Sequence, residues 1–196
     1  MTLPPVIRWP AEAIWEAVVP MLPGFTVEIV PEIDSTNSEL MRRARAGRLE
    51  PVLLVAQAQT AGRGRMGREW HSAPGDSLTF SLALPLAPPD WSGLSLAVGV
   101  SVAESLHPAI GLKWPNDLWW QDRKLAGILI ETALFDSQRY VVIGVGVNIA
   151  PRDATGLSTP PVGRQELLPG IDAAQTLLRV AAPLVQSHGL EYLFAA

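Results

Sequence analysis

The feature that most constrains the fold is a glycine- and arginine-rich segment at residues 59–70, which reads Gln-Thr-Ala-Gly-Arg-Gly-Arg-Met-Gly-Arg-Glu-Trp. Clustered glycines disfavour a helix or strand, because glycine loses the most backbone entropy when it is ordered. The segment lies between two apolar runs, residues 52–56 and 78–84, which are typical of buried strands. The sequence therefore predicts a loop held between two core strands, where binding sites are commonly built.

The arginines of this loop indicate a site for an anion. Arg63, Arg65 and Arg68 carry forked donors that match carboxylate and phosphate oxygens. Residues 62–67 also spell G-x-G-x-x-G, but the turn-forming segment that follows does not begin the helix of a dinucleotide-binding fold. No Gly-Lys-Ser/Thr follows either, which excludes a Walker loop. A solvated surface loop is the alternative interpretation.

Composition limits the classes of protein that fit. A length of 196 residues with 48% hydrophobic residues suits one domain with a substantial core. The absence of cysteine excludes disulfides and thiolate sites, and the three histidines lack metal-ligand spacing. The net charge of −4 gives no overall basic field for nucleic acid. Because the sequence shows neither a signal peptide nor a membrane-spanning run, we predict a cytoplasmic protein with no nucleic-acid or membrane partner.

The pattern of apolar residues predicts alternating helices and strands. Helical periodicity indicates helices over residues 11–21, 91–107 and 171–188, and a further helix that begins within residues 33–40 and ends at about residue 47. Strand-like runs occur at residues 25–30, 52–56, 78–84, 118–120, 124–131 and 140–149, and residues 151–170 are typical of a long loop. Short turns separate the last three strands, so these strands are expected to pair antiparallel.

Two groups of residues outside the loop are candidates for a ligand site. Ser35, Thr36 and Asn37 precede a helix, and Thr36 has capping-box spacing to Glu39. Their polar groups exceed what one helix cap needs, so the surplus is available for a small ligand, although capping alone also explains them. Lys113 lies in or beside a short apolar strand, where it is either a point charge for an anion or a side chain that reaches solvent.

Three glycines inside predicted strands form a further signal: Gly127, Gly144 and Gly146. A glycine within a strand marks a bulge or a close approach to a ligand. Sheet packing alone is the other explanation.

Four segments together resemble the catalytic domain of biotin–protein ligases: residues 35–37, 59–70, 113–117 (Lys-Trp-Pro-Asn-Asp), and 124–129 with 144–148. The resemblance extends over about residues 25–188. It implies an α+β fold related to class II aminoacyl-tRNA synthetases, with a mixed, largely antiparallel sheet flanked by helices. The expected layout is a short N-terminal helical extension (1–24) and a catalytic domain (25–190), with neither a DNA-binding domain nor a C-terminal β-barrel domain.

The resemblance also implies a function, the ATP-dependent formation of biotinyl-5′-AMP. Biotin is then transferred to a lysine of the biotin carboxyl carrier protein of acetyl-CoA carboxylase. ATP and Mg²⁺ are the implied co-substrate and ion, with unknown metal ligands, and a homodimer is left open. The alternatives are a lipoate–protein ligase-like enzyme and a non-catalytic protein that binds biotin or its adenylate.

Site residues follow from the same resemblance, position by position. The implied catalytic residues are Lys113 and Arg65. The implied biotin-binding residues are Ser35, Thr36, Asn37, Gln59, Arg63, Gly64, Arg65, Lys113 and Gly127. The implied nucleotide-binding residues are Arg63, Arg65, Trp70, Lys124 and Asn148.

Overall fold

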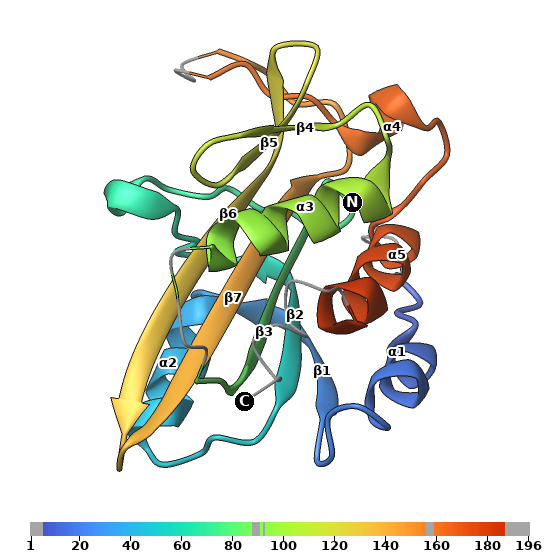
Figure 1. The fold of residues 1–196 in the computed structure, drawn as a ribbon. Coiled ribbons are helices and arrows are strands. Elements are labelled where there is room, and N and C mark those ends of the chain that lie inside the picture. Colours follow the sequence, from blue (N-terminus) through green and yellow to red (C-terminus); the bar gives the residue numbers. More distant parts are fainter. Residues whose placement is uncertain (1–5, 88–90, 92, 156–158, 187–196) are drawn as a thin grey trace.

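The computed structural model describes residues 6–87, 91, 93–155 and 159–186, and it centres on one seven-stranded sheet with helices on both faces (Figure 1). The strands lie in the order β1 (Thr26–Ile33), β2 (Val52–Gln59), β3 (Ser77–Pro85), β7 (Gln138–Asn148), β6 (Arg123–Phe135), β5 (Asp117–Trp120) and β4 (Gly111–Lys113). β1 pairs with β2 in parallel, and the other neighbouring strands pair antiparallel. The predicted mixed, largely antiparallel α+β fold is confirmed.

The two faces of the sheet carry separate hydrophobic cores. α1 (Ala11–Val18), α3 (Leu94–Leu106) and α5 (Ala173–Gln186) cover the larger core, to which Ile14, Val102 and Leu177 contribute. α2 (Thr36–Arg45) packs on the opposite face, where Leu40 and Ala44 belong to the smaller core. Because α1 shares the larger core with the sheet, residues 11–18 pack as part of this fold. In the described part of the chain, no helix is long and apolar enough to cross a membrane.

Several boundaries differ from the sequence-based predictions. β1 continues to Ile33, because its ladder with β2 extends to the pairing of Ile33 with Gln59. α2 therefore begins only at Thr36, with Ser35 in extended conformation as its N-cap, and the Ser35 hydroxyl accepts the Ser38 N–H at 3.3 Å. The predicted capping box of Thr36 and Glu39 is wrong, since the Glu39 carboxylate binds arginines instead.

The helices α1 and α3 are shorter than predicted. α1 ends at Val18, two residues before Pro20. The predicted loop at residues 151–170 contains the four-residue helix α4 (Arg164–Leu167), and a single turn, η1 (Arg65–Gly67), lies in the arginine-rich loop. The end of the last predicted helix, residues 187–188, lies outside the described residues.

Candidate active site

A cavity of about 580 Å³ opens where the start of α2, the arginine-rich loop, the β4–β5 connection and the middle of β6 and β7 meet. Its size suits a small-molecule ligand. All but one of the predicted site residues line it: Ser35, Thr36, Asn37, Gln59, Arg63, Gly64, Arg65, Trp70, Lys113, Lys124 and Gly127. The exception is Asn148, which does not line the cavity. The structure therefore brings together segments, such as Ser35 and Gly146, that are more than one hundred residues apart in the sequence.

Buried hydrogen bonds organise the polar part of the cavity. Gln59 Oε1 accepts the Thr36 backbone N–H at 2.8 Å. Beneath them, the fully buried Ser81 hydroxyl lies 2.7 Å from Thr36 Oγ1 and 2.6 Å from Asn37 Oδ1. Buried polar groups without partners are costly, so this network fixes the three side chains firmly.

The amide of Asn37 is fully engaged within the protein. Its Nδ2 donates to the Leu129 carbonyl at 3.1 Å and to Glu131 Oε2 at 2.9 Å. By contrast, neither Gln59 Nε2 nor the Ser35 hydroxyl proton has an acceptor among the described residues. These two groups are the donors left for the polar end of a ligand.

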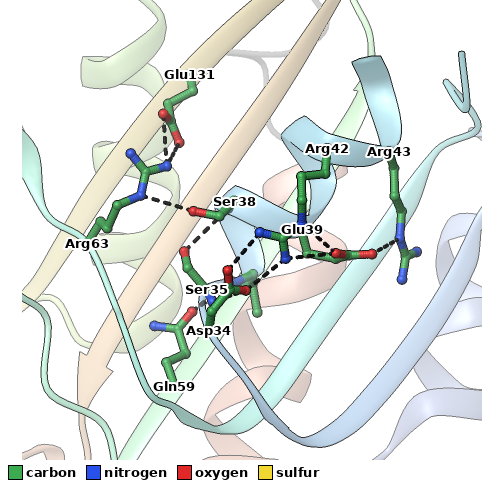
Figure 2. Close-up of polar contacts among 10 residues, drawn as sticks. Asp34, Ser35, Ser38, Glu39, Arg42, Arg43, Gln59, Arg63 and Glu131 are labelled. Atoms are coloured by element: carbon green, nitrogen blue, oxygen red, sulfur yellow. Dashed lines mark hydrogen bonds and ion pairs between the residues drawn. The ribbon is translucent and has the colours of Figure 1, made fainter. Parts of the chain in front are cut away.

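A chain of ion pairs fixes the outer surface of α2 (Figure 2). Arg42 binds Asp34 at 2.7 and 2.8 Å and Glu39 at 2.9 Å, and Arg43 joins Glu39 to Glu28, each at 2.9 Å. The hydrogen bonds from Arg42 are the main cause that lowers the pKa of Asp34 to about 2. This carboxylate adjoins Ser35, so the network helps to hold the start of α2 beside the cavity.

This network predicts a specific acid sensitivity. The contribution of Asp34 to the free energy of unfolding is present above its ordinary pKa of 3.8 and is lost as the pH falls through about 2, because its pKa is lower in the folded state. We therefore expect Asp34→Asn to lower the urea midpoint at neutral pH, with the difference from the parent vanishing near pH 2. Glu32→Gln is the control, because Glu32 makes no ion pair among the described residues. A pH-independent difference would contradict the prediction.

The arginine-rich loop folds back on itself as a narrow turn. The Gly64 N–H donates to the Arg68 carbonyl at 2.7 Å, and the Trp70 N–H donates to the Gly62 carbonyl at 2.9 Å. Met66 and Gly67 form its tip in the left-handed region, with φ of 57° and 72°. A non-glycine residue rarely adopts this conformation, so Met66 is a local site of backbone strain.

The three arginines of the loop differ in their surroundings. Arg63 donates to both carboxylate oxygens of Glu131, at 3.0 and 2.8 Å, and to Ser38 Oγ at 3.1 Å. The side chains of Arg65 and Arg68 are exposed and make neither a hydrogen bond nor an ion pair with any described residue. The loop therefore presents two unpaired cations beside the cavity.

Glycines in β6 and β7 make room for the cavity wall. A Cβ on Gly146 would overlap the Trp70 ring, and a Cβ on Gly144 would overlap the Asn37 amide. On the neighbouring strand, a Cβ on Gly127 would lie 3.5 Å from both Trp70 and Lys124. These strand glycines thus make room for side chains of the protein itself, which agrees with the packing explanation rather than with a close approach to a ligand.

Gly146→Ala is expected to destabilise the protein by about 1–3 kcal/mol, because the added methyl group must displace the Trp70 ring. Gly111→Ala is the matched control, since a Cβ on this strand glycine meets only the Trp119 carbonyl oxygen at 3.9 Å. We expect the control to change stability by less than about 1 kcal/mol. Urea unfolding of both variants checks the prediction, and equal effects would contradict it.

A β-bulge turns Lys124 into the cavity. The β5–β6 register shifts between Leu118 and Trp119, which face Ala126 and Lys124, so Leu125 is the extra residue. Leu125 and Ala126 are both buried in the core, and Lys124 shares the cavity face with Gly127. Its ammonium pairs with Asp117 Oδ1 at 2.8 Å, with the lysine side chain only 25% exposed.

Lys113 occupies a different environment at the end of the edge strand β4. It is exposed, as one of the two alternatives left open by the sequence requires, and its Nζ lies 3.6 Å from the centre of the Trp119 ring. Such a cation–π contact orients the ammonium without neutralising it. The following residue, Trp114, is 83% exposed at the rim of the cavity.

Asn148 supports the site from outside the cavity lining. Its Nδ2 donates to the Lys124 carbonyl at 3.2 Å, and its Oδ1 accepts from Arg152 at 2.9 Å. This placement fixes the backbone of Lys124. Direct contact between Asn148 and a nucleotide stays a prediction.

Sequence reasoning missed several residues of the site, namely Ser81, Asp117, Trp119 and Glu131. Ser81 had a detectable signal, because it is a polar residue inside a predicted buried strand. Asp117 belongs to the Lys-Trp-Pro-Asn-Asp segment, of which only Lys113 is a sequence-predicted site residue. No group of three or more histidine, aspartate or glutamate side chains within the described ranges is arranged to hold a metal ion.

Comparisons with known proteins agree with this geometry. Residues 30–148 match the Biotin/lipoate A/B protein ligase family. The chain is 43% identical to the bifunctional ligase/repressor BirA of Escherichia coli, over 69% of this chain and 44% of that protein. It is 40% identical to the biotin–[acetyl-CoA-carboxylase] ligase of Mycobacterium tuberculosis, over 67% of this chain and 54% of that protein. The chain thus spans about half the length of these relatives.

Solved structures show the same fold. The biotin protein ligase of Aquifex aeolicus in complex with biotin and ATP superposes with a TM-score of 0.66 at 30% identity, over 84% of this chain and 70% of that one. The Leishmania major biotin protein ligase in complex with biotinyl-5-AMP gives 0.65 at 25% identity, over 85% and 76% of the two chains.

Proposed function

Because the chain belongs to the biotin/lipoate A/B protein ligase family, we propose that it is the catalytic part of a biotin–protein ligase. In this proposal it forms biotinyl-5′-AMP from biotin and ATP. It then transfers biotin to a lysine of a biotin carboxyl carrier protein. The names of its relatives and the ligands of the Aquifex structure support these substrates.

The observation that carries the proposal is one cavity lined by both free polar donors and cations. The Ser35 hydroxyl and Gln59 Nε2 suit the carbonyl oxygen of a ureido ring. Lys113, Lys124 and Arg65 suit a carboxylate and a phosphate. A biotinyl-adenylate carries a ureido ring at one end and a phosphate near the other, so it requires both sets of groups.

In the first step, a biotin carboxylate oxygen attacks the α-phosphorus of ATP and pyrophosphate leaves. Two anions must approach each other, so fixed positive charges lower the barrier. Lys124 is the better enclosed of the two lysines, and its pairing with Asp117 keeps its ammonium at the cavity wall before substrates arrive.

In the second step, a lysine amine of the carrier attacks the acyl carbon of the mixed anhydride, and AMP leaves. These two reaction steps require no side-chain nucleophile from the ligase. The arginine-rich loop would protect the anhydride from water while the carrier binds.

The nucleotide has candidate contacts in the same cavity. We propose that the Trp70 ring packs against the base and that Arg65 binds the phosphate. The single cavity carboxylate of the Lys-Trp-Pro-Asn-Asp segment, Asp117, fits a Mg²⁺ ion that arrives with ATP phosphates, since Mg²⁺ commonly takes one or two carboxylates. When bound, the ion would neutralise phosphate charge.

ATP–pyrophosphate exchange tests the proposed function. We expect exchange to depend on biotin and to be negligible with lipoate, whose dithiolane ring cannot accept the hydrogen bonds that Ser35 and Gln59 offer. Exchange with lipoate instead would favour a lipoate–protein ligase. Tight biotin binding without any exchange would indicate a non-catalytic binding protein.

A further inference from the structure

We propose that Glu131 is a positioning residue that holds the arginine-rich loop over the cavity. Its carboxylate joins Arg63 of the loop to Asn37 of the cavity wall. The inference rests on the proposed function only for the identity of the ligand. The contact between Glu131 and Arg63 is observed in the structure itself.

The contact between loop and sheet is a two-oxygen ion pair. Arg63 Nη2 lies 3.0 Å from Glu131 Oε1 and 2.8 Å from Oε2, while Arg63 Nε donates to Ser38 Oγ at 3.1 Å. Figure 2 shows the guanidinium of Arg63 directed at Glu131 and Ser38. The Glu131 side chain is 25% exposed and the Arg63 side chain 45%, so solvent screens this pair in part, and its two-oxygen geometry is what favours it over a single-contact pair.

The same carboxylate also holds the cavity wall. Glu131 Oε2 accepts from Asn37 Nδ2 at 2.9 Å, and Asn37 is buried against Gly144. One side chain of β6 is therefore shared by the start of α2 and the loop. A loop that moves away leaves this carboxylate without its cationic partner, which makes departure unfavourable.

The arginines of the loop consequently have different tasks. The side chain of Arg63 is bonded to Glu131 and Ser38, whereas those of Arg65 and Arg68 have no partner among the residues described. Arg63 acts on ligand affinity through the position of the loop. Arg63 Nη1 has no partner among the described residues, so the direct ligand contact that the sequence suggested is compatible with this ion pair.

A double-mutant cycle tests the coupling. The dissociation rate of a non-hydrolysable biotinyl-adenylate mimic is measured for Glu131→Gln, Arg63→Met and the double variant. We expect each single variant to release the mimic about fivefold to tenfold faster, and the double variant to release it no faster than either. Arg68→Met is the matched control. Because Arg68 does not contact Glu131, the rate increases from Arg68→Met and Glu131→Gln should multiply in their double variant. Multiplicative effects of the Glu131 and Arg63 substitutions would overturn the proposal.

A second measurement needs no ligand and so separates this inference from the proposed function. Limited trypsin digestion of the ligand-free protein should cleave the Glu131→Gln variant faster within residues 63–68, with an unchanged urea midpoint. Glu32→Gln, on β1, should digest like the parent. Equal cleavage of the Glu131→Gln variant and the parent would refute the positioning role even if the ligand is bound as proposed.

Discussion

Lys124→Met is expected to slow biotin-dependent pyrophosphate exchange by about two to three orders of magnitude. The substitution removes a fixed charge from the cavity where two anions must meet, a loss of about 3–4 kcal/mol in transition-state stabilisation. Steady-state exchange at saturating biotin and ATP measures the effect, and methionine preserves most of the packing against Gly127.

Lys113→Met is the matched comparison, because both lysines line the cavity but only Lys124 is largely enclosed. Solvent screens the exposed Lys113 ammonium, so we expect a loss of about one order of magnitude. The sequence-based choice of Lys113 as the principal contact requires the opposite order. A larger loss for Lys113→Met would restore that choice, and near-parental exchange in Lys124→Met would remove Lys124 from the reaction.

The sequence predicted most of the sheet because its strands have clear local sequence patterns. Apolar runs such as residues 52–56 and 140–149 are bounded by turn residues, and both form buried strands, β2 and β7. Short turns correctly indicated the antiparallel order of β5, β6 and β7. Local patterns could not show the parallel pairing of β1 with β2. Parallel neighbours need a crossover connection, and here α2 supplies it on one face of the sheet.

The site was predicted as a set of residues but not as a set of contacts. Sequence patterns identified the segments that meet at the cavity, yet they could not show that the Asn37 amide is engaged by Ser81 and Glu131. They also could not show that Lys124 points into the cavity, because a one-residue bulge at Leu125 sets the face of β6 on which Lys124 lies. Such contacts arise only when distant strands come into register.

Arg164 shows the same limit outside the site. Its side chain is fully buried, and Nη2 donates to the Leu106 carbonyl at the end of α3 at 2.7 Å. Burial is the main cause that lowers its pKa to about 10. An arginine in a predicted loop gives no indication of such burial, since arginine is rarely buried without a carboxylate partner.

Arg65→Ala is expected to release biotinyl-adenylate about 10- to 100-fold faster while adenylate formation continues. The Arg65 guanidinium is exposed at the cavity and bonded to no other described side chain, so it is free to bind the phosphate when the loop closes. Charge-assisted hydrogen bonds of this kind contribute about 1.5–3 kcal/mol. Stopped-flow dissociation of the adenylate mimic measures the rate, and a mass-spectrometric count of biotin on an unrelated protein detects the escaped adenylate.

Arg68→Ala separates the role of Arg65 from a general effect of loop charge. Both arginines are exposed, both flank the strained tip at Met66, and both line the cavity. If charge near the cavity is all that matters, the two variants should release adenylate at similar rates, and both rates should fall together with added salt. We expect only Arg65→Ala to label the bystander protein, because Arg65 begins the turn η1 whereas Arg68 follows it, in the returning stem where its carbonyl accepts the Gly64 N–H. Equal labelling by the two variants would show that the loop retains adenylate through its net charge rather than through one arginine.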